Sequence, residues 1–65
     1  MYIKIKNGCK DALHEAKHKY VNYLGDGLDL NIESYDGTEI KYHFDDITKV
    51  DIYVMNDQGK TIDHI

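Results

Sequence analysis

Hydrophobic and polar side chains alternate over residues 2–6, with Ile3 and Ile5 as the apolar positions. A period of two is typical of a β-strand that buries one face. Asn7 and Gly8 then interrupt the alternation, and either residue can cap a helix that follows. We therefore expect a strand over residues 2–6 and a change of structure directly after it.

From residue 9 to residue 24 the apolar positions follow the period of an α-helix. At 100° per residue, five of them fall on one narrow stripe: Cys9, Leu13, Ala16, Tyr20 and Leu24. Such a stripe predicts an amphipathic helix with its apolar side buried. Gly25 follows at once and is well suited to the left-handed conformation that ends many helices.

The rest of the chain returns to a period of two. Strands are predicted at residues 28–33, 39–44 and 50–55, and a short last strand at residues 60–65. The Asp36-Gly37 pair predicts a type I′ hairpin turn between the first two of these strands. Residues 56–59 predict a second turn, before the last strand.

These elements give the order β-α-β-β-β-β in a single domain of residues 1–65. The order predicts an α+β fold, in which one helix packs on one face of a small, mostly antiparallel sheet. A core built from 65 residues is small, and chains of this size often need a disulfide, a metal or a partner subunit. Because Cys9 is the single cysteine, an intramolecular disulfide is excluded.

One helix covers only one face of such a sheet, so the other face is expected to lie open. The chain contains six tyrosines, and tyrosine is common at interfaces because it combines a large apolar ring with a polar tip. We expect a binding surface on the open face, formed by Tyr2, Lys4, Tyr35, Lys41, His43, Tyr53 and Met55. Self-contact through such a face most often gives a symmetric homodimer.

The charge balance argues against nucleic acid and membranes as partners. Twelve acidic residues against eight basic ones give a formal charge of −4, and every basic residue is a lysine. The absence of arginine weakens any phosphate-binding interpretation. No apolar run approaches the ~20 residues of a membrane span, and no signal-peptide pattern is present, so we expect a cytoplasmic protein. Residues with AT-rich codons dominate, which favours a low-GC source such as a phage or another mobile element.

His14, Glu15 and His18 match H-E-x-x-H, which resembles the metal-binding helix of zinc peptidases. In that motif two histidines one helical turn apart bind zinc, and the glutamate acts as general base. On the helix predicted here, however, these side chains lie on the solvent side, away from any cleft. We therefore expect no catalytic site and no cofactor, with metal binding by His14 and His18 as an alternative.

The sequence thus predicts a small non-enzymatic protein–protein interaction module that forms a homodimer. Its size and composition favour a phage or mobile-element protein that inhibits or modulates a host protein, such as a component of a defence system. Two alternatives remain open. One is a zinc-binding protein that uses His14 and His18, and the other is an oligomeric sponge that holds a small ligand between subunits.

Overall fold

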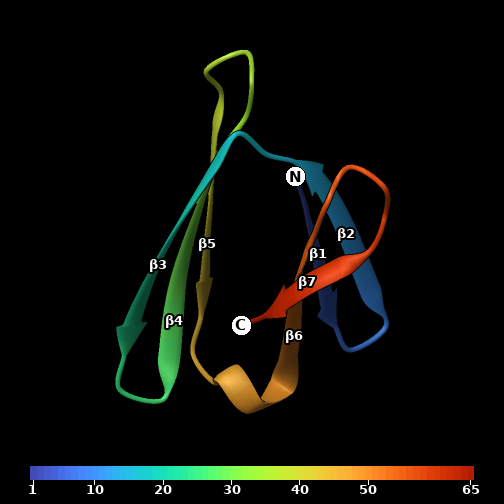
Figure 1. Cartoon of the computed structure of the whole chain (residues 1–65). Coiled ribbons are helices and arrows are strands. Elements are labelled where there is room, and N and C mark those ends of the chain that lie inside the picture. Colours follow the sequence, from blue (N-terminus) through green and yellow to red (C-terminus); the bar gives the residue numbers. More distant parts are fainter.

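The computed structural model describes all 65 residues and contains seven antiparallel strands in two sheets (Figure 1). The strands are β1 (Tyr2–Asn7), β2 (Lys10–Glu15), β3 (His18–Leu24), β4 (Gly27–Glu33), β5 (Glu39–Phe44), β6 (Val50–Met55) and β7 (Thr61–His64). A 3-10 turn, η1 (Ile47–Lys49), joins β5 to β6. One sheet has the strand order β2-β1-β6-β7 and the other the order β3-β4-β5. The protein is therefore all-β, and the predicted α+β fold is wrong.

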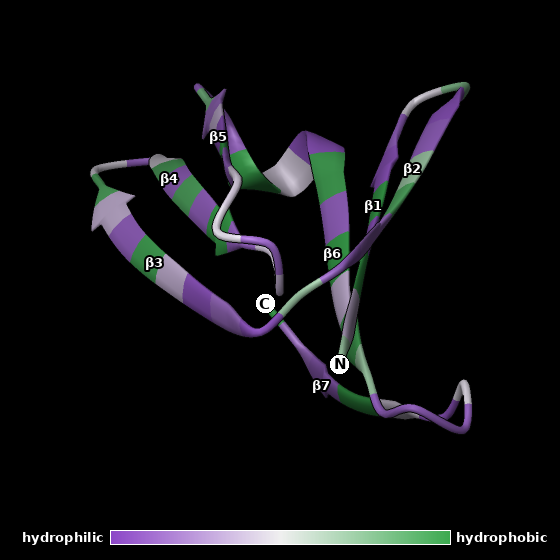
Figure 2. Cartoon of the chain, turned by 90° about the horizontal axis from the view of Figure 1, so that it is seen from above, coloured by the Kyte–Doolittle hydropathy of each residue, from purple (hydrophilic) through white to green (hydrophobic).

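The two sheets face each other across one apolar core. Figure 2 shows hydrophobic and hydrophilic residues alternating along β4 and β6, as the sequence pattern predicts for strands with one buried side. The buried core residues are Ile3, Ile5, Ala16, Leu28, Leu30, Ile32, Val50, Ile52 and Val54. Apart from Ala16, all of them come from β1, β4 and β6, and no polar or charged residue is buried. The second sheet covers the core where a helix was predicted to do so.

The segment predicted as a helix forms β2 and β3 instead. Of its apolar stripe only Ala16 is buried, while Leu13, Tyr20 and Leu24 are 61%, 55% and 48% exposed and Cys9 is exposed as well. The reason lies in the neighbouring strands. β1 bonds to β6 on one side and β4 bonds to β5 on one side, so each has a second edge that needs a partner. β2 and β3 pair with those edges, which a helix cannot do.

Ala16 and Lys17 carry the chain from one sheet to the other, so that β2 and β3 resemble one long strand with a bend. The amide of Ala16 donates to the carbonyl of Met1, and the amide of Lys17 donates to the carbonyl of Glu33, each at 2.8 Å. The first bond extends the pairing with β1 and the second extends the pairing with β4. Strands that change sheet through a bend in this way form the corners of β-sandwiches.

Gly8 and Gly25 belong to two-residue hairpin turns. The strand register leaves Gly8-Cys9 and Gly25-Asp26 as the two loops. Both glycines have a positive φ, 64° and 61°, and the residues after them do not. Glycine at the first central position is the pattern of a type II′ turn. A helix stop needs the same positive φ, which is why Gly25 also fits the end of a helix in the sequence.

The hairpin predicted at Asp36-Gly37 is confirmed, but its turn is not of type I′. The amide of Ser34 donates to the carbonyl of Thr38 at 2.8 Å, and the amide of Gly37 donates back to the carbonyl of Ser34 at 3.1 Å. Gly37 has a φ of 88° and no neighbouring residue shares a positive value, whereas type I′ requires two. The loop is therefore the three-residue kind that ends on a left-handed glycine.

Candidate functional site

The outer side of the four-stranded sheet brings together four of the predicted binding residues. Across β1 and β6, Tyr2 pairs with Met55 and Lys4 pairs with Tyr53. The ring of His64 in β7 stacks on Tyr53, with 4.6 Å between ring centroids. We call this surface the Tyr53 face; its side chains are Asp11, Leu13, Glu15, Tyr2, Lys4, Lys6, Asp51, Tyr53, Met55 and His64.

The other three predicted residues lie on the second sheet. Lys41 and His43 point outward from β5, and Tyr35 lies 61% exposed in the turn between β4 and β5. The sheets meet through their inner sides, so their outer sides are on opposite sides of the molecule. The seven residues predicted as one surface are therefore divided between two.

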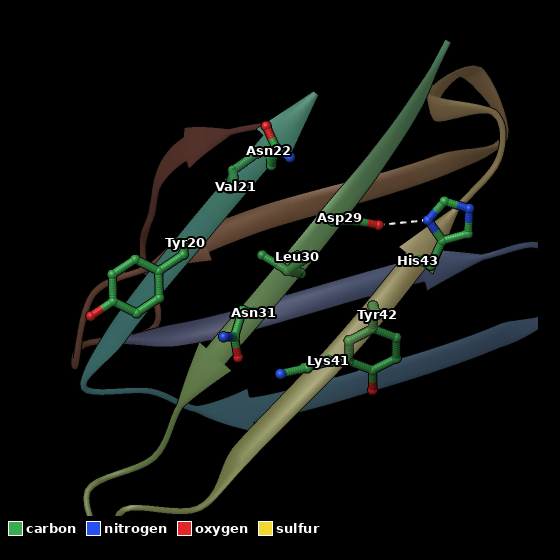
Figure 3. A pocket seen from close by; sticks show the side chains of 9 residues that line it. All are labelled: Tyr20, Val21, Asn22, Asp29, Leu30, Asn31, Lys41, Tyr42 and His43. Carbon is green, nitrogen blue, oxygen red and sulfur yellow. Dashed lines mark hydrogen bonds and ion pairs between the residues drawn. The ribbon is translucent and has the colours of Figure 1, made fainter. Parts of the chain in front are cut away.

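The outer side of β3-β4-β5 contains the hollow shown in Figure 3, with a volume of about 360 Å³. Its centre is a row across the three strands formed by Tyr20, Asn31 and Lys41. Figure 3 shows all three side chains on the same side of the sheet. We call this surface the Asn31 face; its side chains are His18, Tyr20, Asn22, Asp29, Asn31, Glu33, Glu39, Lys41 and His43.

Asn31 is the unusual residue of this face. It occupies the middle of the central strand, and its Oδ1 atom is buried without a hydrogen-bond partner. A buried acceptor without a donor costs about 1–3 kcal/mol, so most such atoms in proteins are paired. Because the atom is closed to solvent, an incoming N–H or O–H group recovers this cost only when neighbouring side chains of the hollow move aside. The hollow therefore favours ligands that bring a hydrogen-bond donor to Asn31.

The Asn31 face is also strongly acidic. Asp29, Glu33 and Glu39 project from it, and Asp45 joins them through a hydrogen bond to His43. Lys41 is the only lysine of the face. Four carboxylates against one ammonium group give a formal charge of −3, or −2 when His43 is protonated. A surface of this kind attracts positively charged groups and repels phosphate.

His43 connects two of these carboxylates. Its Nδ1 atom lies 2.5 Å from Oδ1 of Asp29, and its Nε2 atom lies 2.9 Å from Oδ1 of Asp45. The hydrogen bond to Asp29, and next the one to Asp45, raise the pKa of His43 above its ordinary value of 6.5. Because a protonated imidazole donates through both nitrogens, the charged form fits this bridge best.

This bridge predicts a pH dependence that can be measured. A histidine whose pKa is higher in the folded state stabilises the fold fully below its unfolded pKa of about 6.5 and loses that contribution as pH rises through the folded pKa. We expect NMR titration to show His43 ionising above 6.5, and Asp29→Asn to lower that pKa. The free energy of unfolding should then decline less between pH 6 and 8 in the variant than in the wild type. Ionisation of His43 at or below its ordinary pKa would contradict the bridge.

The H-E-x-x-H residues are not brought together as the zinc interpretation requires. His14 lies in β2, where its Nε2 atom is 2.6 Å from the hydroxyl of Tyr42 in the opposite sheet. His18 lies in β3 beside Tyr20, with 6.4 Å between ring centroids. The helix that would place both histidines one turn apart is absent. No group of three or more His, Cys, Asp and Glu side chains is arranged to hold a metal ion.

Two important residues of the hollow were not identified from the sequence. Tyr20 belongs to the buried stripe of the helix that the sequence predicts, and Asn31 is not among the predicted binding residues. The signal for Asn31 was nevertheless present. Asparagine is depleted in strands, and this one lies between Leu30 and Ile32, which are both buried.

Comparison with protein-family models, with curated proteins and with solved structures gives no match. No family assignment follows. The fold has no helix with the length and hydrophobicity needed to cross a membrane. The function is therefore inferred from the residues of the two outer faces.

Proposed function

We propose that the protein is a non-enzymatic binding module whose Asn31 face docks a basic surface of another protein. The observation that supports this most strongly is the unpaired Oδ1 atom of Asn31, which lies beside a hollow in an otherwise acidic face. A partner that supplies positively charged N–H donors satisfies the amide oxygen and neutralises the surrounding carboxylates at once.

Lysine and arginine side chains fit this hollow by their chemistry. Both carry several N–H donors and no acceptor, so neither leaves a group unpaired against Asn31 or Asp29. Tyr20 is 55% exposed at the rim, and its ring can lie against a guanidinium group in a cation–π contact. A second copy of the same acidic face, or a nucleic acid, would instead oppose like charges.

Four further hypotheses rest on the sequence alone. The phage or mobile-element origin, the inhibition of a host protein and the cytoplasmic location stay predictions from size and composition. A small-ligand sponge between subunits also stays a prediction, whereas zinc binding by His14 and His18 has lost the helical spacing on which it was based.

A peptide titration tests the proposed docking site. The probe is a short peptide of alternating arginine and glycine, followed by amide chemical shifts of the ¹⁵N-labelled protein. We expect the largest shifts in β4 around Asn31, and an affinity that falls with added salt because salt screens charges. Asn31→Leu should weaken binding at least about tenfold, since a hydrogen bond to a charged donor contributes about 1.5–3 kcal/mol.

The matched control is Asn7→Leu, the same substitution at an exposed position at the end of β1, outside the Asn31 face. Neither substitution changes the net charge. The control should alter the affinity by less than about twofold, as exposed positions usually do. Asn31→Leu should not lower the melting temperature, because it removes an unpaired polar atom. Equal weakening by both variants, or shifts spread over carboxylates on all sides of the protein, would contradict the proposal.

A further inference from the structure

Every pair across the central seam of the Tyr53 face is complementary, whereas on the Asn31 face Glu33 lies opposite Glu39. Reading along β1 and β6, Lys6 is opposite Asp51, Lys4 is opposite Tyr53, and Tyr2 is opposite Met55. These pairs are a cation with a carboxylate, a cation with an aromatic ring, and an aromatic ring with a thioether. Each combination is attractive at close range.

We propose that the Tyr53 face binds a second copy of this chain around a two-fold axis parallel to the β1–β6 seam. A rotation about that axis places β1 of one chain over β6 of the other. Lys6 then meets Asp51 of the partner subunit, and Lys4 meets Tyr53 of the partner subunit. Because each of these β1 side chains is complementary to its neighbour in β6, the rotation brings complementary side chains of the two subunits together. An isologous interface requires this self-complementarity.

The charges of the face select this arrangement over others. An axis perpendicular to the strands and passing through Lys4 would bring the two copies of Lys4 together. The parallel axis avoids that contact and pairs opposite charges. Three carboxylates, those of Asp11, Glu15 and Asp51, face the two lysines, so the Tyr53 face is close to neutral and offers little repulsion to a copy of itself.

Exposed apolar surface on the flanking strand β2 adds to the contact, because Leu13 of this face is 61% exposed. By strand spacing, four strands of about six residues span roughly 19 by 20 Å, or about 400 Å² per chain in projection. The two chains together bury roughly 800 Å², less than the ~1,200 Å² at which standard specific interfaces begin, so we expect a weak, reversible dimer that depends on concentration.

This inference does not depend on the proposed function. The dimer would use the side of each sandwich that lies opposite the Asn31 face, so both Asn31 faces would point outward and stay accessible. If both proposals hold, the dimer presents two acidic docking faces, and a partner with two basic sites would bind it more tightly than the monomer.

Complementary charge reversal gives a sharp test. In the proposed dimer, Lys6→Asp puts a carboxylate at position 6 of one subunit opposite the carboxylate of Asp51 in the other. Asp51→Lys instead puts two ammonium groups opposite each other. We expect sedimentation equilibrium to show a dimer for the wild type and monomers for each variant, with the dissociation constant raised at least about tenfold. An equimolar mixture of the two variants should form a heterodimer, because each carboxylate then faces an ammonium group.

Both substitutions are at exposed positions, with Asp51 57% exposed, so the variants should stay folded by circular dichroism. The control is a second pair of charge reversals, Lys10→Asp and Asp57→Lys, at positions outside the Tyr53 face. Each of these variants, and their mixture, should dimerise like the wild type. The proposal is overturned if the wild type is monomeric at several hundred micromolar, if either Tyr53-face variant dimerises like the wild type, or if the mixture stays monomeric. The peptide titration of Asn31 is a separate readout, so failure of one proposal does not decide the other.

Discussion

Gly27→Ala is expected to cause the largest loss of stability of any single methyl addition in this protein. Gly27 opens β4 and is buried. A Cβ atom at this position would lie 2.6 Å from the carbonyl oxygen of Phe44 and 3.2 Å from that of Asp45. Both contacts are with backbone, which cannot rotate away as a side chain does. Overpacking of this kind typically costs about 1–3 kcal/mol or more.

Thermal unfolding followed by circular dichroism measures this effect. For a domain of this size about 1 kcal/mol corresponds to roughly 4–8 °C, so we expect the melting temperature to fall by about 10–20 °C. Gly8→Ala is the matched control, because nothing lies within 4 Å of its Cβ position and its cost comes only from the positive φ of 64°. That cost is about 1–2 kcal/mol. A smaller effect at Gly27 than at Gly8 would contradict the close packing of the β3–β4 turn against the end of β5.

Leu30→Ala and Leu24→Ala are expected to differ strongly, although they make the same chemical change. Leu30 is 1% exposed at the centre of the core, and Leu24 is 48% exposed at the end of β3. Removing a buried leucine side chain costs about 2–5 kcal/mol because apolar contacts are lost and a cavity is left. For a 65-residue domain the total stability is only about 3–10 kcal/mol, so Leu30→Ala should leave the protein close to unfolding.

Urea unfolding of both variants decides between the two folds. Leu24→Ala should change the free energy of unfolding by less than about 1 kcal/mol, as exposed positions usually do. On the amphipathic helix predicted from the sequence, Leu24 belongs to the buried stripe and its loss would cost several times more. Comparable losses at both positions, or a far-ultraviolet spectrum with strong helical bands, would contradict the all-β structure.

The inward and outward positions of most strands could be predicted from the sequence alone. Alternation correctly identified the buried residues of β1, β4 and β6, because a period of two is a local property of an extended chain. The surface predicted from the sequence includes Lys41 and His43, and these two residues do lie together on the Asn31 face. The hairpin between β4 and β5 followed from the same local signals.

The conformation of residues 9–24 could not be decided in this way. Cys9, Leu13, Ala16, Tyr20 and Leu24 fit a helical stripe, and Gly25 fits both a helix stop and a hairpin turn. The choice depends on the free edges of β1 and β4, which are left once β1 has paired with the distant strand β6 and β4 has paired with β5. Local propensity is a weak guide where such edges compete for backbone hydrogen bonds.

By itself, then, the sequence determined which side chains of β1, β4, β5 and β6 face the core, since that requires only the order of neighbouring residues. The tertiary structure alone decided which strands share a sheet. It thereby separated Tyr53 from His43 on opposite faces, and it placed Asn31 between Tyr20 and Lys41 with its amide oxygen unpaired. The first outcome depends on the pairing of β1 with β6, which are far apart in the chain. The second depends on residues 18–24 pairing with β4 as a strand, although their local pattern favours a helix.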